Sequence, residues 1–347
     1  MDDSSLLSNR KADHIRINLA ENVDSTNSNG LELFRFEHCA LPDINFEDID
    51  TRQSIFGRKV NLPLIISSMT GGTREAEVIN MRLAEVAQAS GLAMGVGSQR
   101  VGLKKESTQD TFRVRKAAPD ILLFANIGAV QLNYGYGVDE CLRAVEMIEA
   151  DALYLHLNPL QEALQPEGDT NFSGLLEKIE QVCKQVPVPV FIKEVGWGIS
   201  GDVALKLASA GVSGIDVAGA GGTSWSEVEK HRMTDPVRAK VAGAFRSWGI
   251  PTAESLIQVR ASAPELVLIS SGGIRSGTDV AKSISLGAVM AGMAGPFLKA
   301  IVKSTSAALQ LVEELSLELR VCMFAAGAKD IQSLQKISLL REQKGLK

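Results

Sequence analysis

SSGGIRSGTDVAKSISLGA, residues 270–288, and AGMAGPF, residues 291–297, are the stretches that decide the fold. In each stretch, a short apolar run is followed by glycine and then by residues typical of the start of a helix. Gly272 and Gly273 let backbone N–H groups approach an anion closely, and Arg275 is a charged donor beside them. Gly295 precedes a proline in the first turn of the next helix, whose free N–H groups also favour an anion. Two such loops in succession predict a phosphate site, as formed after the last two strands of a (β/α)₈ barrel.

Eight short apolar runs begin at residue 62, and longer amphipathic segments separate them. Most are unbroken rather than alternating, as in parallel strands that helices cover on the outside. Their number and spacing predict an α/β fold, a single (β/α)₈ TIM barrel over residues 62–305. The runs are LPLIISSM (62–69), LAMGVGS (92–98), ILLFANIG (121–128), ALYLHLN (152–158), VPVFIKEV (188–195), SGIDVAG (213–219), ELVLISSG (265–272) and AVMAGMAG (288–295).

The segments between the runs carry helical spacing and helix-end signals. We expect one helix that is capped by Asp202 and ends before Gly211. Further helices are predicted over residues 76–90, 138–149, 174–185 and 279–286.

Three regions lie outside the repeating pattern. Residues 1–61 form an N-terminal extension, and its polar stretch 22–30 is expected to be mobile. Residues 220–250 make a long segment after the sixth strand, which on the catalytic face of a barrel often acts as a lid. Residues 306–347 predict one or two amphipathic helices packed on the barrel.

Composition excludes several functional classes. The 347 residues carry a formal net charge of −5 and no basic arm, so we expect no binding of nucleic acid. No apolar run reaches the ~18 residues that span a bilayer. The first residues lack the apolar core of a secretory signal, so the expectation is a cytoplasmic protein without a membrane partner. The cysteines form no C-x-x-C pair and are expected to be free thiols: Cys39, Cys141, Cys183 and Cys322.

The loop at 270–288 resembles that of the FMN-binding barrel enzymes as a class. This class includes α-hydroxyacid oxidases, inosine monophosphate dehydrogenases and an isoprenoid isomerase. An oxidase needs a histidine base after the sixth strand, but residues 216–225 (DVAGAGGTSW) contain none, and His231 lies beyond them. A dehydrogenase of the inosine monophosphate type needs a cysteine in a glycine-rich loop. Cys39 precedes the barrel, and Cys141 and Cys183 are expected in helices.

The other loops resemble those of the type 2 isopentenyl diphosphate isomerases. The resemblance extends from Arg10 to about Phe297, with one departure at Ala218, where a small hydroxyl residue is expected in many relatives. That departure implies the loss of one hydrogen bond to the flavin. The matching stretches are RKADH (10–14), SSMTGG (67–72), GVGSQR (95–100), ANIG (125–128), LHLNPLQE (155–162), KEVGWG (193–198) and GAGGTSW (219–225).

The resemblance implies FMN across the barrel mouth, with its phosphate on the last two loops and its ring near the first five strands. Lys193 follows the apolar residues VFI, and its ammonium would stabilise the anionic reduced ring. The residues expected to bind FMN are Ser68, Met69, Thr70, Ser98, Asn126, Lys193, Thr223, Gly273, Ile274, Arg275, Ala294 and Gly295.

A diphosphate substrate needs several cations or a metal ion. Glu162 is expected to bind Mg²⁺, which keeps water ligands and needs only one or two carboxylates besides phosphate oxygens. His156 and Asn158 are two apart in a strand and therefore point to the same side. The residues expected to bind the substrate are Arg10, Lys11, His14, Ser98, Gln99, Arg100, His156, Asn158 and Gln161.

The implied reaction interconverts isopentenyl and dimethylallyl diphosphate by allylic proton transfer without net redox. In the family, reduced FMN is the acid and base, NADPH serves only to reduce it, and Gln161 would act beside it as a proton relay or positioning group. The resemblance also implies a homotetramer or homo-octamer. Two alternatives stay open: an FMN-dependent oxidoreductase on the same barrel, and a non-catalytic flavin- or phosphate-binding barrel that acts as a scaffold or sensor.

Overall fold

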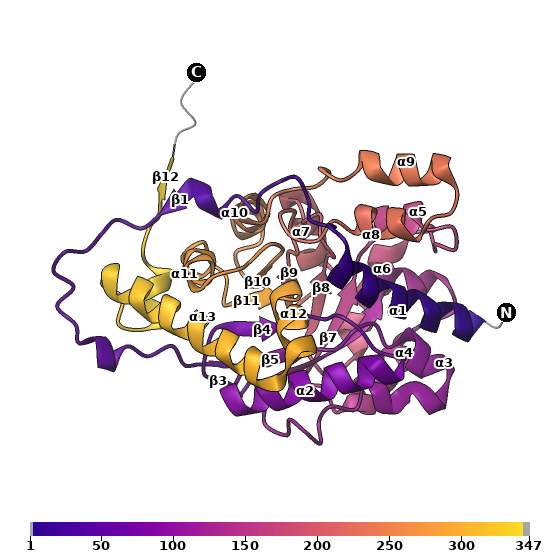
Figure 1. Ribbon diagram of the computed structural model, residues 1–347, viewed down its shortest axis with the longest axis horizontal. Helices are drawn as coiled ribbons and strands as arrows, with labels where there is room; N and C mark the ends of the chain where they lie inside the picture. Colours follow the sequence, from indigo (N-terminus) through magenta and orange to yellow (C-terminus); the bar gives the residue numbers. More distant parts are fainter. Residues whose placement is uncertain (1–2, 343–347) are drawn as a thin grey trace.

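A computed structural model describes residues 3–342 and contains a closed barrel of eight parallel strands (Figure 1). Neighbouring strands pair in chain order, and the last pairs with the first through Ala291–Leu64, Gly292–Ile65 and Met293–Ile66. Each predicted apolar run contains one strand, so the predicted (β/α)₈ barrel is confirmed. The strands are β4 (Leu64–Ile66), β5 (Ala93–Gly95), β6 (Leu123–Gly128), β7 (Ala152–His156), β8 (Val190–Lys193), β9 (Gly214–Asp216), β10 (Val267–Ser271) and β11 (Met290–Met293).

Helices surround the barrel, and the predicted ones begin and end close to the expected residues. The helix between β8 and β9 is capped by Ser200, whose side chain accepts a hydrogen bond from the Val203 N–H. The expectation that Asp202 caps it is wrong, because Asp202 already lies in the first helical turn. The helices of the barrel part are α2 (Arg74–Ser90), α3 (Arg100–Lys104), α4 (Val138–Ile148), α5 (Pro159–Leu164), α6 (Leu175–Gln185), α7 (Gly201–Ser209), α8 (Trp225–Arg232), α9 (Pro236–Ala244), α10 (Thr252–Ser262), α11 (Gly277–Ser285) and α12 (Gly295–Lys303), with short 3₁₀ turns η3 (Glu106–Thr111) and η4 (Ala129–Asn133).

The N-terminal helix α1 (Asp3–Ala20) contacts α3 and α8. After it, residues 22–30 run over the loops that follow β9 and β10. The Ser25 N–H donates to the Gly222 carbonyl, the Ser224 N–H donates to the Val23 carbonyl, and the Asn29 amide donates to the Gly273 carbonyl. These bonds anchor the stretch, so the expectation of a mobile segment is wrong. We call residues 22–30 the strap.

A short hairpin closes the barrel at the end opposite the strap. Strands β2 (Gln53–Ile55) and β3 (Arg58–Val60) are joined by Phe56 and Gly57, both at positive φ (49° and 77°), the conformation that a two-residue hairpin turn requires. Gln53 donates to the Val289 carbonyl and Arg58 pairs with Asp151, both just before a barrel strand. The buried side chains of the hairpin join the core inside the barrel, which contains Ile55, Val60, Ile65, Ala93, Leu122, Phe124, Ala152, Tyr154, Phe191, Ile269 and Met290.

The C-terminal part contains two helices, as expected, and a short strand. Helix α13 (Thr305–Ala325) packs on α2, α11 and α12, and α14 (Ile331–Gln335) follows it. Strand β12 (Leu340–Arg341) pairs antiparallel with β1 (Phe34–Arg35), which lies between the 3₁₀ turns η1 (Leu31–Leu33) and η2 (Phe46–Asp48). Residues 34–35 and 340–341, which are far apart in the sequence, therefore lie side by side (Figure 1). The cysteines are unpaired, and among residues 3–342 no helix is long and apolar enough to cross a membrane.

The hairpin gives a direct test of how the barrel is closed. Ile55→Ala removes a side chain that is 7% exposed and should lower the free energy of unfolding by about 2–5 kcal/mol, because it leaves a cavity in the barrel core. Denaturant titration measures the change. The matched control is Val78→Ala on α2, where the side chain is 45% exposed and the expected change is below about 0.5 kcal/mol. An equal decrease in the free energy of unfolding of the two variants would show that the Ile55 side chain does not stabilise the barrel core.

Candidate active site

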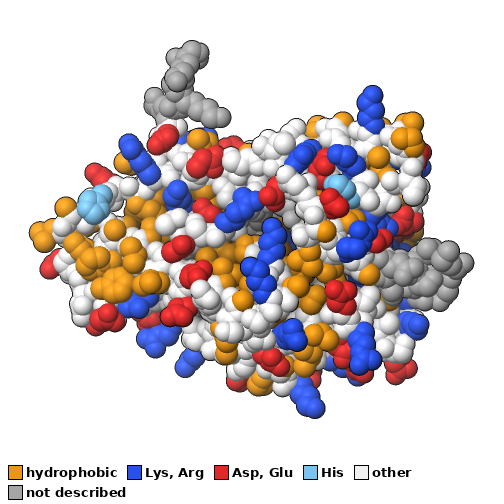
Figure 2. Space-filling view, viewed as in Figure 1, with side chains coloured by type: hydrophobic (Ala, Val, Ile, Leu, Met, Phe, Trp, Pro, Cys, Tyr) orange, Lys and Arg blue, Asp and Glu red, His pale blue; other side chains and the backbone are white. Residues whose placement is uncertain are grey.

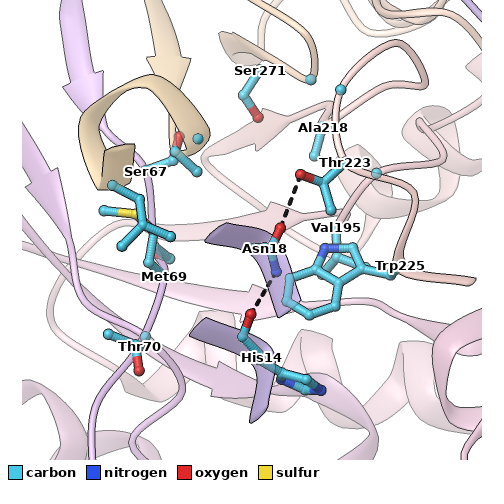
Figure 3. Close-up of a pocket in the computed structure, with 18 of the residues that line it drawn as sticks. His14, Asn18, Ser67, Met69, Thr70, Val195, Ala218, Thr223, Trp225 and Ser271 are labelled. Atoms are coloured by element: carbon cyan, nitrogen blue, oxygen red, sulfur yellow. Dashed lines mark hydrogen bonds between the residues drawn. The ribbon is translucent and has the colours of Figure 1, made fainter. Parts of the chain in front are cut away.

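A cavity of about 730 Å³ lies at the carboxyl ends of the barrel strands, beneath α1 and the strap. Most of the predicted site residues line it, although they come from the N-terminal helix and from all eight barrel strands or the loops after them. Ser67, Met69 and Thr70 stand on one side, while Val195, Ala218 and Thr223 stand on the other (Figure 3). Lys and Arg side chains gather near the middle of the surface on one face of the molecule (Figure 2).

Two loops shape one end of the cavity with backbone alone. Gly272 and Gly273 have φ of 105° and 75°, and a Cβ on either would come within 2.1–2.3 Å of the carbonyl oxygens of Gly219 and Gly221. Only glycine fits these positions. Helix α12 begins at Gly295, with proline next in its first turn, and Ala294, Gly295 and Ile274 all line the cavity. Free N–H groups at the start of this nine-residue helix make this end suited to an anion.

Arg275 also lines this end but is largely exposed. Its guanidinium lies 3.4 Å from a carboxylate oxygen of Asp24 in the strap, and its backbone N–H donates to Asp279. The strap therefore lies over this end of the cavity and places a carboxylate beside Arg275.

The side of the cavity formed by the β4 loop carries hydroxyl groups without partners. Ser67 Oγ, Ser68 Oγ and Thr70 Oγ1 are buried and make no hydrogen bond to any described residue. Since an unsatisfied buried hydroxyl is costly, this wall is built to meet polar atoms of a ligand. Opposite, Thr223 donates to Asn18 of α1 over 3.3 Å (Figure 3). Ala218 lines the cavity at φ 36°, an unusual conformation for a residue other than glycine.

Lys193 and His156 end neighbouring strands and both line the cavity. The Lys193 ammonium lies 3.3 Å from the Asp216 carboxylate and donates to Ser271 Oγ. Burial, followed by the charges of Lys193 and Arg10, lowers the pKa of His156 to about 3. His156 is therefore neutral, and its Nδ1 lies 2.8 Å from the amide oxygen of Asn126.

Helix α1 brings three predicted residues to the opposite end of the cavity. Arg10 donates to Gln165 over 2.6 Å, and Lys11 donates to the Ser98 carbonyl over 2.7 Å. Burial, together with the charge of Arg10, lowers the pKa of Lys11 to about 7. His14 donates from Nε2 to a carboxylate oxygen of Glu229 at 3.0 Å, and burial lowers the pKa of His14.

Glu229 connects these groups to the residues after β7. It accepts hydrogen bonds from Gln161, His14 and Arg232 while being fully buried. Burial alone would raise its pKa, but the hydrogen bond and charge of His14 and the charge of Arg232 lower that pKa to about 2. The Gln161 oxygen accepts from Asn158, so both ends of the Gln161 amide are held.

Glu162 lies at the centre of a second polar network. One carboxylate oxygen accepts from Asn158 over 2.9 Å and the other from the Asp169 N–H over 2.8 Å. Burial raises the pKa of Glu162, and these hydrogen bonds partly oppose that rise. Asp169 also pairs with Arg100 over 2.6 Å. The described residues contain no cluster of three His, Cys, Asp or Glu side chains, so Glu162 would need water and ligand oxygens to complete a metal site.

One predicted contact does not fit. Gln99 is fully buried behind the wall, where its amide donates to the Ala144 carbonyl and accepts from the Asn126 N–H. Its side chain cannot also reach a substrate, so the prediction that it binds one is wrong for this side chain. Its role is to hold β6 in place beneath the cavity.

The sequence interpretation missed several polar residues of this region, among them Asn18, Ser67, Asp216, Glu229 and Ser271. Glu229 could have been found, because it lies four residues after Trp225 in a helical stretch and so on the same face. Asp216 and Ser271 are polar residues near the ends of two apolar runs, which was a signal for the site, whereas Asn18 carried none because its partner Thr223 lies far away in the chain.

The chain is similar to several known proteins. A family model described as FMN-dependent dehydrogenase matches residues 153–341. Proteins named isopentenyl-diphosphate delta-isomerase are similar over nearly the whole chain: that of Nostoc sp. is 56% identical over 96% of this chain and 95% of its own length, and that of Synechocystis sp. is 51% identical over 97% of each.

Solved structures resemble the fold at low identity. A lactate oxidase of Pediococcus acidilactici has a TM-score of 0.67 at 17% identity, covering 98% of this chain and 94% of that one. A mandelate oxidase in a structure with (S)-2-phenylpropionate has a TM-score of 0.65 at 20% identity, covering 97% of this chain and 98% of that one. These likenesses concern the fold alone. Because proteins of this name are 51% and 56% identical to the chain over nearly its whole length, the chain belongs to the isopentenyl-diphosphate delta-isomerase family.

Proposed function

We propose that this protein interconverts isopentenyl and dimethylallyl diphosphate with bound FMN. The observation that carries the proposal is a single cavity with two anion-binding ends, one made of glycine backbone and the other of side chains from α1 and the β5 loop. A cofactor phosphate and a substrate diphosphate need such separate ends. The names of the relatives support this choice among the reactions that flavin barrels perform.

The residues present fit FMN. Gly273, Ile274, Arg275, Ala294 and Gly295 would hold its phosphate, since they line the glycine end at the start of α12. The unpartnered hydroxyls of Ser68 and Thr70, with Met69 between them, would meet the ring. The remaining proposed contacts are Ser98, Asn126, Lys193 and Thr223.

The substrate would occupy the end beneath α1. We propose that Arg10, Lys11, His14 and Arg100 bind its diphosphate, because they supply cations or N–H donors in a confined space. Ser98, His156, Asn158 and Gln161 line the same end. Glu162 would hold Mg²⁺ against the phosphate oxygens. The N-terminal extension would thus contribute to substrate binding through these side chains of α1, while α13 of the C-terminal segment packs on α2, α11 and α12.

Reduced flavin supplies the acid and base for the allylic proton transfer when it is bound, and the chain supplies the surroundings. Protonation of an alkene develops positive charge on carbon, so water must be excluded. Helix α1 would help to exclude water. Its His14 and Trp225 of α8 both line the cavity, and their ring centroids lie 5.0 Å apart in an edge contact. Neutral His156 adds no repelling charge. Gln161, held by Glu229 and Asn158, positions the reacting carbons.

Further parts of the proposal follow from the family resemblance. NADPH would serve only to reduce the flavin. The protein would act in the cytoplasm as a homotetramer or homo-octamer. These points are independent of the geometry described above.

The decisive experiment measures isomerisation with dithionite-reduced FMN and Mg²⁺ but without NADPH. We expect full turnover, because no electrons are consumed. Oxidised FMN without a reductant is the control and should give no turnover. A requirement for one NADPH per product, or a product two electrons away from the substrate, would instead support the oxidoreductase alternative.

Removal of the metal ligand tests the role of Glu162. Glu162→Gln should lower activity at fixed Mg²⁺ by more than about a hundredfold, because the carboxylate that would anchor the ion is lost. Activity is measured across a magnesium titration, with FMN absorbance as a check on folding. Glu167→Gln, on a nearby and more exposed carboxylate, should leave the magnesium dependence unchanged. If the two variants gave the same dependence of activity on magnesium concentration, Glu162 would not be a metal ligand.

Lys11 predicts a pH dependence of substrate binding. Its pKa of about 7 means that the free enzyme loses this charge as the pH rises through neutrality. A bound diphosphate favours the ammonium, so binding takes up a proton and KM should rise up to about tenfold per pH unit above 7. In Lys11→Arg the charge persists, and KM should stay flat over pH 7–9. A KM that rises equally in both proteins would assign the titration to another group.

A further inference from the structure

Lys193 has a buried counter-ion that the sequence interpretation did not foresee. Lys193 and Asp216 are paired residues at the carboxyl ends of the adjacent strands β8 and β9. Parallel pairing places both side chains on the same side of the barrel wall. The ammonium and a carboxylate oxygen lie 3.3 Å apart, and Asp216 is only 1% exposed. Lys193 lines the cavity, whereas Asp216 lies behind it.

The Asp216 carboxylate is saturated with donors. One oxygen accepts from Ser271 Oγ at 2.5 Å and from the Ala218 N–H at 3.3 Å. The other faces the Lys193 ammonium and accepts from the Tyr154 hydroxyl at 3.4 Å. Burial and the nearby charge of Asp216 raise the pKa of Tyr154, so the phenol stays neutral and donates. Strands β7, β8, β9 and β10 thus all contribute to a fixed carboxylate.

Lys193 is fixed in turn. Its ammonium donates to the Glu194 carbonyl over 3.1 Å and to Ser271 Oγ over 3.4 Å. Ser271 therefore joins the lysine and the carboxylate in one triangle. The ammonium has little freedom, because each of its neighbours belongs to a barrel strand or the residue directly after one.

We infer that Asp216 is a positioning residue that fixes the Lys193 ammonium at the cavity wall, offsets its charge, and thereby lowers the reduction potential of the bound flavin. The inference rests on the FMN site proposed above. Two electrons and one proton convert the oxidised ring into the reduced anion, so the ring gains one negative charge. Lysine alone favours that charge, and a carboxylate directly behind the lysine opposes it.

Asp216→Asn tests this inference, because it keeps the shape and removes the charge. The Lys193–Asp216 pair then changes from neutral to one net positive charge beside the ring. We expect the midpoint potential to rise, with the ratio of reduced to oxidised FMN at fixed potential increasing about tenfold, which is ~30 mV for a two-electron couple. Reductive titration of the FMN-loaded protein against a reference dye measures the shift, and flavin absorbance reports occupancy.

Tyr154→Phe is the matched control. It removes a donor to the same carboxylate but changes no charge, so the ratio should change less than threefold. If Asp216→Asn fails to retain FMN, Asp216→Ser replaces it with a smaller neutral side chain and the same expected rise. A lowered or unchanged potential in the neutral variant that retains FMN would overturn the inference. Failure of the unaltered protein to bind FMN would instead overturn the proposed function, so the two failures are distinguishable.

Discussion

Closure of the eight parallel strands into one ring is the constraint on which the site depends. It brings the residue that ends each strand beside the residue that ends the next, as with His156, Lys193 and Asp216 on three successive strands. A lysine, an aspartate and a neutral histidine can be buried together only because strand pairing fixes their distances and each finds a partner. The hairpin of β2 and β3 fills the opposite end, which leaves the carboxyl ends as the open mouth.

The sequence predicted the barrel well because its signals are local. Unbroken apolar runs mark the strands, and most of the polar residues predicted in the loops after them line the mouth. Prediction failed where the outcome depended on a partner. Gln99 is polar and lies in a site loop, yet it satisfies the backbone of Asn126 instead. The sequence of the strap is that of a polar coil, and its anchors are partners far away in the chain, such as the carbonyls of Gly222 and Gly273.

The arginine side chains at the end of the cavity beneath α1 have acceptors within the protein. Arg100 is paired with Asp169, Arg10 is bonded to Gln165, and Arg232 is paired with Glu229. Such partners hold buried cations that would otherwise be unsatisfied. A diphosphate bound as proposed would compete with these protein acceptors for the cationic side chains. The free energy of binding would then be the difference between the contacts to the diphosphate and the contacts within the protein that it replaces. Such a difference favours selectivity among ligands over high affinity.

The strap also determines the order in which the molecule is assembled. Residues 22–30 are made early in synthesis, whereas their docking carbonyls, at Gly222 and Gly273, are made about two hundred residues or more later. The first part of the chain must therefore wait, undocked, until the second half of the barrel has folded. Once it docks, it lies over the loops that shape the glycine end. The part of the cavity wall formed by Asn22, Val23 and Asp24 is therefore among the last parts of the molecule to form.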